Sequence, residues 1–418
     1  MTKQDLIKKL ARTKKANQEL SLSTVHQRNR ALLEIAKILE QNQAEILRVN
    51  QRDIEKIERT NPLCDRLLLT KERLKNIIND IKTMTKLPDP VNQILEQRTL
   101  KNRLKLKKIS VPFGVIAVIY ESRPNVTVDV VGLCLKSGNA IVLKGGVDAW
   151  ATNQILVRLI KQAIKKAGFS QDLILNINPK DRYLVRHLLS AKDYIDLIIP
   201  RGGTGLIKFV QENTKIPMIE TGAGVCHTYV DDSANLEMAV NIIYNGKTSR
   251  PSACNALDTL IVCHKIADRF LPILGQKLAE SQVEIFADSI SHKILRQSKY
   301  PYLQRVQKTD FGREFLSLKM AIKTVEDIDE ALAHVRKYST KHSEAIVTET
   351  SQNAQRFLSE VDAACVYHNA STRFTDGSEF GMGGEIGIST QKMHARGPMS
   401  ASELATYKWV IKGIGQVR

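Results

Sequence analysis

Strands that are apolar along their whole length alternate with helical stretches through most of this chain. The run GVIAVIY at 114–120 is continuous and β-branched, as expected for a strand covered on both faces. Further short strands are predicted at 140–143, 173–177 and 194–200, with a long helix at 148–166 that Gly168 ends. Alternation at this spacing predicts βαβ units and a parallel sheet with right-handed crossovers.

A second series of the same kind begins near residue 256. Strands are predicted at 256–262, 283–288, 314–322, 344–349 and 363–369, with helices between most of them. At 418 residues the chain is too long for one ordinary core. The predicted fold class is therefore α/β, with two doubly wound parallel-sheet domains.

Two other regions differ from this alternation. The N-terminal 87 residues have the periodicity of amphipathic helices. Residues 92–110 are polar and alternating, and predict an exposed β arm. Because an isolated hairpin is marginally stable, we expect the arm to pair with another subunit, giving a homo-oligomer that is a dimer or larger.

The chain carries 62 Lys and Arg against 44 Asp and Glu, a formal net charge of +18. Because the basic residues are scattered and aromatic content is only 5%, a surface that attracts phosphorylated small molecules is favoured over a nucleic-acid groove. Six widely spaced cysteines without CxxC pairs argue against a disulfide framework and a metal site. We expect a cytoplasmic protein without membrane or nucleic-acid partners.

Cys254 lies in a short polar turn between a helical stretch and the apolar run 256–262. A thiol in such a turn is open to substrate and to nearby cations that stabilise thiolate, so we interpret it as a nucleophile. The alternative is a buried structural cysteine.

Three glycines, Gly202, Gly203 and Gly205, lie between a predicted strand and a predicted helix. Free backbone amides and the helix dipole favour an anion at such a turn, although a plain tight turn is the alternative because GxGxxG spacing is absent. The glycine-rich segment 371–398 has no regular periodicity, and a loop of that length usually carries function.

Four long motifs resemble those of the γ-glutamyl phosphate reductase family within the aldehyde dehydrogenase superfamily. They lie at 111–146 (VPFGVIAVIYESRPNVTVDVVGLCLKSGNAIVLKGG), 245–262 (NGKTSRPSACNALDTLIV), 377–399 (GSEFGMGGEIGISTQKMHARGPM) and 404–409 (LATYKW). The resemblance implies an aldehyde dehydrogenase-like fold with a small β oligomerisation arm. The implied division is a cofactor-binding domain of residues 1–91 and 111–245, a catalytic domain of residues 246–395, and an arm and tail of residues 92–110 and 396–418.

The resemblance also implies roles for individual residues. The implied catalytic residues are Cys254 as the thiol, Asn125 as an oxyanion donor and Glu220 at the position of a general base. The implied cofactor is NADPH/NADP, bound by Lys144, Gly202, Gly203, Gly205 and Glu314. Anionic groups of the substrate suit arginine, and the candidates are Arg123, Arg250, Arg373 and Arg396. His227 and His394 are candidates for proton transfer, with structural roles as the alternative.

The implied reaction is reduction of L-glutamate 5-phosphate to L-glutamate 5-semialdehyde and phosphate through a cysteine thioester, a step of proline biosynthesis. Association with glutamate 5-kinase is an implied partnership. The alternative is a hydrolytic aldehyde dehydrogenase, which would need Glu220 to activate water. A reductase that starts from an acyl phosphate does not need that water, so the role of Glu220 stays open.

Overall fold

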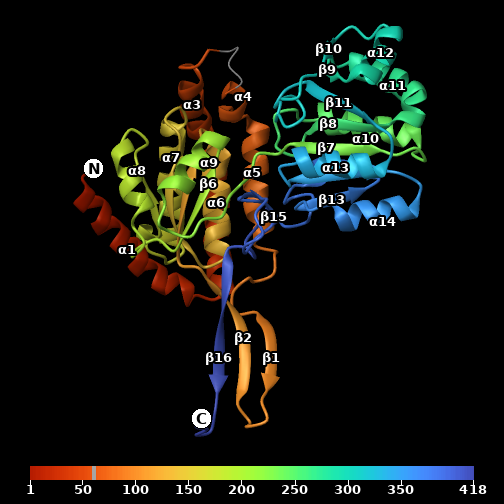
Figure 1. The fold of residues 1–418 in the computed structure, drawn as a ribbon. Coiled ribbons are helices and arrows are strands. Elements are labelled where there is room, and N and C mark those ends of the chain that lie inside the picture. The colour runs from red at the N-terminus through yellow and green to blue at the C-terminus, as the bar shows by residue number, and fades with distance from the viewer. Residues whose placement is uncertain (59–62) are drawn as a thin grey trace. The chain divides into compact units, whose positions relative to one another are not determined.

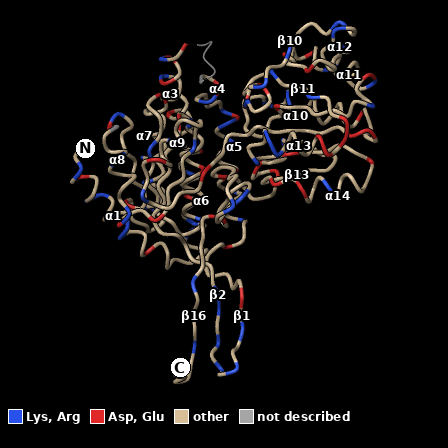
Figure 2. The backbone as a smooth tube through the Cα atoms, in the orientation of Figure 1, with Lys and Arg blue, Asp and Glu red and all other residues tan. Residues whose placement is uncertain are grey.

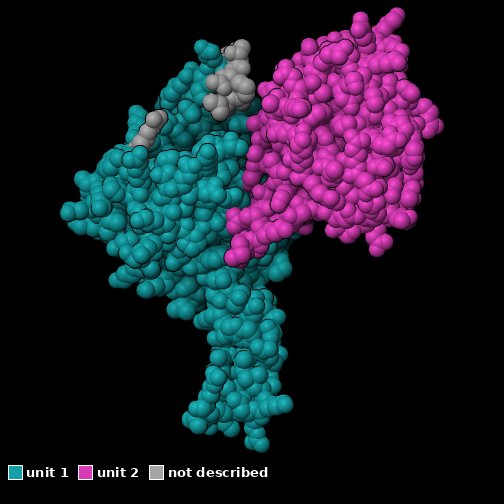
Figure 3. Space-filling view, in the orientation of Figure 1, with its two compact units in different colours: residues 1–221, 381–387, 398–418 teal, residues 222–380, 388–397 magenta. Residues whose placement is uncertain are grey.

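A computed structural model describes residues 1–58 and 63–418. The chain forms two compact units, coloured separately in Figure 3. Unit 1 contains residues 1–221, 381–387 and 398–418, and unit 2 contains residues 222–380 and 388–397. Each unit is built on a parallel sheet, which confirms the predicted fold class. Residues 59–62, within the predicted N-terminal helical region, lie outside the described residues.

The chain passes from unit 1 to unit 2 between Thr221 and Gly222, whereas the sequence places a domain boundary near residue 245. The functional division into cofactor-binding and catalytic domains stays a prediction.

Unit 1 has a four-stranded parallel sheet in the order β5-β4-β3-β6. All six residues of the central strand β3 are buried, as its unbroken apolar sequence predicts. The strands are β3 (Val115–Tyr120), β4 (Ala140–Lys144), β5 (Ile174–Asn176) and β6 (Leu197–Arg201).

Helices cover both faces of this sheet (Figure 1). Helices α6 and α7 lie on one face with α2, α3 and α5 packed behind them, and α1, α8 and α9 lie on the other. Gly168 follows α7 with a φ of +95°, the left-handed conformation that ends a helix and was predicted there. The helices are α1 (Lys3–Ser21), α2 (Val25–Gln41), α3 (Gln43–Ile54), α4 (Leu63–Leu67), α5 (Lys71–Met84), α6 (Pro124–Lys136), α7 (Trp150–Lys166), η1 (Gln171–Leu173), α8 (Arg182–Leu189) and α9 (Thr204–Asn213).

The predicted arm is a three-stranded antiparallel sheet in the order β1-β2-β16. Its strands are β1 (Ile94–Thr99), β2 (Lys105–Pro112) and β16 (Ala405–Lys412). The sequence predicts the β1-β2 hairpin, and the structure adds a third strand from the C-terminal segment. Lys and Arg residues are frequent along the arm (Figure 2).

Unit 2 has a seven-stranded parallel sheet in the order β10-β9-β11-β8-β7-β12-β13. Its apolar core includes the fully buried side chains of Phe270 and Phe357. The strands are β7 (Cys226–Val230), β8 (Leu257–Cys263), β9 (Glu284–Ala287), β10 (Leu303–Arg305), β11 (Lys319–Val325), β12 (Ser343–Val347) and β13 (Cys365–His368).

The helices of unit 2 are α10 (Leu236–Thr248), α11 (His264–Ala279), α12 (Ser289–Gln297), α13 (Ile328–Tyr338), α14 (Ser351–Glu360) and η2 (Thr372–Phe374). Two short strands, β14 (Gly387–Ser389) and β15 (Gly397–Met399), pair where the chain passes from one unit to the other. They lie in the glycine-rich segment, for which the sequence predicts an irregular loop.

One predicted strand is shorter than expected. The sequence predicts a strand over 314–322, but β11 begins at Lys319. Leu316 has a φ of +53°, which interrupts the extended backbone. Glu314 therefore lies in a loop before β11, and its predicted position within a strand is wrong.

Candidate active-site residues in the two units

In unit 1, residues predicted to bind cofactor (Lys144, Gly202) and substrate (Arg123) lie at the carboxyl ends of adjacent strands. Lys144 is the last residue of β4, Gly202 follows β6, and Arg123 follows β3 as the residue before α6. Because β3, β4 and β6 are parallel, these positions share one edge of the sheet. This is the edge at which open α/β sheets bind their ligands.

The glycine turn at the start of α9 already holds an anionic group. Gly203 precedes the helix, and its N–H donates to Glu121 Oε1 at 2.8 Å. A Cβ at Gly202 would lie 2.7 Å from the same oxygen, so a larger residue there would require the Glu121 side chain to move. The amide at this helix N-terminus thus binds a negative charge, as its dipole favours. Sequence reasoning missed Glu121.

The loop after Lys144 packs tightly against the loop after β3. A Cβ at Gly146 would collide with the Ser122 hydroxyl, and that hydroxyl donates to Asp148 Oδ2 at 2.8 Å. Gly146, the second glycine of the KGG sequence, is therefore required for close packing beside Lys144.

Asn125 lies in the first turn of α6, and its Nδ2 donates to Asp129 Oδ2 at 3.2 Å. Burial, assisted by the neighbouring charge of Asp80 and opposed by the Asn125 hydrogen bond, raises the pKa of Asp129 to about 7. Asp129 therefore titrates near neutral pH beside the predicted oxyanion donor. Sequence reasoning missed Asp129, because a carboxylate within a largely apolar helix gives no signal of its partners.

Glu220 lies near the end of the first segment of unit 1, and it is half-buried. The chain before it is held by a bridge between Met218 and Ile198, and Thr221 after it donates to the carbonyl of Pro200 at 2.6 Å. Glu220 is thus placed beside β6. Its catalytic role stays a prediction.

In unit 2, Cys254 lies in the predicted turn between α10 and β8. The turn is held by backbone bonds from Ala253 to Arg250 and from Ala256 to Ala253, both 3.1 Å long. Cys254 is partly exposed, whereas Cys226 and Cys263 in the neighbouring strands are buried. Only the partly exposed thiol of these three is accessible to a substrate.

Two of the predicted arginines lie at this turn. Arg373 Nε donates to Ser249 Oγ at 3.1 Å, and its guanidinium also donates to Asn255 Oδ1. Burial lowers the pKa of Arg373, and the nearby charge of Arg250 lowers it further, so the two cations are close neighbours. An anionic substrate group near Cys254 would be attracted to both.

Arg396 belongs to a different charge cluster. It forms an ion pair with Asp362 at 2.8 Å, and Asp362 also pairs with Lys392 and Lys341. Hydrogen bonds from Lys392 and Arg396 hold the pKa of Asp362 well below its usual range. Arg396 is therefore engaged by a carboxylate, whereas Arg373 is held by neutral side chains.

The two histidine candidates have different surroundings. His227 is fully buried, and its Nδ1 lies 3.0 Å from Glu344 Oε2, an arrangement that supports its structural alternative. His394 is exposed, with a φ of +62°.

Glu314 is bonded to Gly224, which packs against the backbone of Cys254. Its Oε1 accepts a hydrogen bond of 3.0 Å from the N–H of Gly224. A Cβ at Gly224 would collide with the carbonyl oxygen of Cys254, so only glycine permits this contact. Gly224 is a further residue that sequence reasoning missed, since nothing in a lone glycine reveals a close approach from a distant turn.

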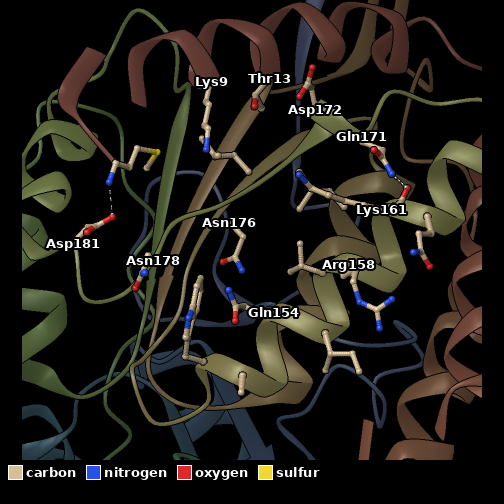
Figure 4. A pocket seen from close by; sticks show the side chains of 18 of the residues that line it. Lys9, Thr13, Gln154, Arg158, Lys161, Gln171, Asp172, Asn176, Asn178 and Asp181 are labelled. Atoms are coloured by element: carbon tan, nitrogen blue, oxygen red, sulfur yellow. Dashed lines mark hydrogen bonds and ion pairs between the residues drawn. The ribbon is translucent and has the colours of Figure 1, made fainter. Parts of the chain in front are cut away.

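Unit 1 also contains a hollow of about 1000 Å³ beside the free edge of β5 (Figure 4). Its polar lining comes mainly from α1, α7 and β5, and includes Lys9, Arg12, Gln154, Arg158, Lys161 and Asn176. The residues predicted to bind cofactor or substrate do not line this hollow.

Among residues 1–58 and 63–418, no group of three or more His, Cys, Asp and Glu side chains is placed to hold a metal ion. Within the same residues, every helix is too short or too polar to cross a membrane.

Comparison with known proteins identifies the class of this fold. Residues 1–290 match the model of the aldehyde dehydrogenase family, and the chain belongs to that family. An acetylating aldehyde dehydrogenase from Geobacillus thermoglucosidasius shares the fold, with a TM-score of 0.72, 18% identity, and coverage of 100% of this chain and 98% of that one.

More similar relatives identify the branch. The chain is 49% identical over 419 residues to the γ-glutamyl phosphate reductase of Pelodictyon phaeoclathratiforme, covering 100% of this chain and 99% of the relative. The crystal structure of γ-glutamyl phosphate reductase from Thermotoga maritima has a TM-score of 0.93 and 43% identity, with 99% of each chain covered. Within the aldehyde dehydrogenases, the chain therefore belongs to the γ-glutamyl phosphate reductase family.

Proposed function

We propose that this protein reduces L-glutamate 5-phosphate to L-glutamate 5-semialdehyde and phosphate with NADPH, as a step of proline biosynthesis. The observation that carries the proposal is full-length similarity to γ-glutamyl phosphate reductases at 49% identity, combined with a partly exposed cysteine in the turn between α10 and β8.

The proposed nucleophile is the thiolate of Cys254. It attacks the acyl carbon of the acyl phosphate, phosphate leaves with the bonding electron pair, and a thioester forms. When bound, NADPH supplies the hydride that reduces the thioester carbon. The resulting thiohemiacetal collapses to the aldehyde and frees the thiolate.

Both tetrahedral species carry an oxyanion, which needs hydrogen-bond donors. The backbone N–H of Cys254 and the side chain of Asn125 are the proposed donors. One N–H of the Asn125 side chain donates to Asp129, and this hydrogen bond orients the Asn125 amide. The second N–H of that amide is the proposed donor to the oxyanion.

The anionic groups of the substrate are assigned to arginines. Arg250 and Arg373 are proposed to bind its phosphate or α-carboxylate, because they are neighbours at the Cys254 turn. Arg123, which follows β3 at the edge of the unit 1 sheet, stays a candidate. Arg396 comes last, since it is already paired with Asp362.

The residues of unit 1 fit a dinucleotide. The N–H of Gly203 accommodates a carboxylate at the N-terminus of α9, so a phosphate group suits the same position. Lys144 is a cation at the same sheet edge and suits the 2′-phosphate of NADPH, which supports NADPH over NADH. Glu314 is the proposed partner of the nicotinamide ribose.

Six free cysteines and the absence of a disulfide among the described residues support a reducing, cytoplasmic location. Within residues 1–58 and 63–418, β1 and β16 are each paired along one edge only, which supports a homo-oligomer. An association with glutamate 5-kinase stays a prediction from the family resemblance.

The test is phosphate-dependent reduction of NADP by glutamate semialdehyde. We expect Cys254→Ala to abolish turnover while Cys365→Ala, at another partly exposed cysteine of unit 2, retains it. Near-normal turnover of Cys254→Ala would reject the covalent mechanism. A hydrolytic aldehyde dehydrogenase would instead show phosphate-independent activity that is lost in Glu220→Gln.

A further inference from the structure

Lys247 is a fully buried cation in the last turn of α10, seven residues before Cys254. Its ammonium donates to the carbonyls of Lys319 at 2.7 Å and Ser317 at 3.2 Å, and to Asp258 Oδ1 at 3.4 Å. All three donors of the ammonium are therefore used within unit 2. The helix that leads into the nucleophile turn is thereby joined to the segment that leads into β11.

Asp258 is the matching group on the other side of the turn. It is the second residue of β8, 2% exposed, and its Oδ1 accepts a hydrogen bond of 3.1 Å from the N–H of Phe315. Phe315 directly follows Glu314. Both stems of the Cys254 turn are thus bonded to the short segment that carries Glu314.

A second set of contacts connects Glu314 to Cys254 through Gly224. Glu314 Oε1 accepts from the N–H of Gly224, and Gly224 lies directly against the carbonyl oxygen of Cys254. The Cys226 thiol donates to that same carbonyl at 3.3 Å. Cys254 and Glu314 are therefore connected through the buried pair on one side and through Gly224 on the other.

The cost of burying both charges indicates that the Lys247–Asp258 pair does more than stabilise the fold. Burial lowers the pKa of Lys247 and raises that of Asp258, which shows that both charges lose hydration. Buried ion pairs of this kind commonly contribute no more stability than apolar residues of similar size. What the pair provides, and apolar residues would not, is directional bonding to Ser317, Lys319 and Phe315.

We propose that Lys247 and Asp258 are a positioning pair that holds the nucleophile turn of Cys254 in a set relation to the carboxylate of Glu314. The inference rests on the roles proposed above for those two residues. Neither member of the pair is proposed to touch the reacting atoms; the two residues flank the turn, and each is bonded to backbone groups of residues 315–319.

The test is the double variant Lys247→Met/Asp258→Asn, which removes both charges with little change of volume. The amide side chain introduced by Asp258→Asn keeps an oxygen that can accept from the Phe315 N–H, so folding is expected to survive. We expect KM for NADP to rise at least about fivefold and the rate of Cys254 alkylation by iodoacetamide to change at least about threefold. A merely structural role would lower Tm without moving either quantity in the folded enzyme.

The matched control is Lys265→Met/Asp232→Asn, which removes an exposed Lys-Asp pair of the same unit with a 3.0 Å contact. Both quantities should stay within about twofold of wild type. If the buried-pair variant also stays within twofold, the positioning role is rejected. If that variant does not fold, Asp258→Asn alone, which leaves Lys247 on its two carbonyl acceptors, is judged by the same two measurements.

Cys254→Ala, assayed alongside, separates the two proposals. Turnover by Cys254→Ala would reject the proposed function itself. An inactive Cys254→Ala together with a buried-pair variant that behaves as wild type would reject only the positioning role.

Discussion

At the residue scale, Glu121 accepts a hydrogen bond from the backbone amide at which a cofactor phosphate is expected to bind. Its carboxylate accepts from Gly203 at 2.8 Å and lies 4.0 Å from Arg66. A bound pyrophosphate would compete with this negative charge for the same N–H.

We therefore expect Glu121→Gln to lower KM for NADP by about three- to tenfold at low ionic strength, with a smaller effect in about 0.5 M salt. Initial-rate kinetics at both salt concentrations measure it. Glu72→Gln, at an exposed carboxylate on α5, is the control and should change neither value. An unchanged KM in Glu121→Gln would reject the competition, and a raised KM would show that the carboxylate supports cofactor binding.

Asp129 is the basis of a second prediction at the residue scale, which concerns the pH dependence of stability. Its pKa is about 7 in the folded protein, against 3.8 as its ordinary value. The folded state therefore binds the proton more tightly, so this group's contribution to stability is complete below about pH 4 and is lost as pH rises through 7. Asp80 and Glu385 face the group and disfavour its charge, while Arg201 and Asn125 favour it.

Asp129→Asn removes the titration and keeps an acceptor for Asn125. We expect the variant to be more stable than wild type by about 1 kcal/mol at about pH 8, with the difference shrinking toward about pH 5. Urea denaturation at both pH values measures it, with Asp193→Asn at an exposed carboxylate of unit 1 as the control. A difference that is the same at both pH values would contradict the raised pKa.

At the scale of helices and strands, the sequence predicts those elements that apolar periodicity determines. The buried strand β3, the helix α7 with its glycine end, and the position of the Cys254 turn follow directly from local pattern. Glu314 shows where local pattern fails. Residues 314–322 are predicted as one strand, yet Phe315 and Ser317, two of its first five residues, are bonded to the side chains of Asp258 and Lys247 in a different part of the unit.

The same limit applies to the site residues. Residue type and motif indicate Cys254 and Lys144, because a thiol in a turn and a cation at a strand end have recognisable chemistry. Glu121, Asp129, Gly224 and Asp258 are indistinguishable in sequence from surface carboxylates and ordinary glycine. Only tertiary contacts with residues far along the chain reveal what they do, as with Gly224 and Cys254.

At the scale of the whole molecule, the arm leaves two strand edges without a partner among the described residues, since β2 is paired on both sides while β1 and β16 are each paired on one. Alternate residues of β16 expose large side chains: Tyr407 is 52% exposed and Ile411 is 58% exposed. An apolar, half-paired β ribbon of this kind favours association with a second copy.

Ile411→Glu places a charge on this exposed row without disturbing a buried contact. We expect it to shift the protein toward a lower oligomeric mass in sedimentation velocity, because a desolvated carboxylate at an interface is costly. Lys412→Glu is the control, since the next residue of the strand points to the opposite face. If both variants keep the wild-type mass, or if wild type is itself a monomer, the arm has no part in self-association and its apolar row must serve another surface.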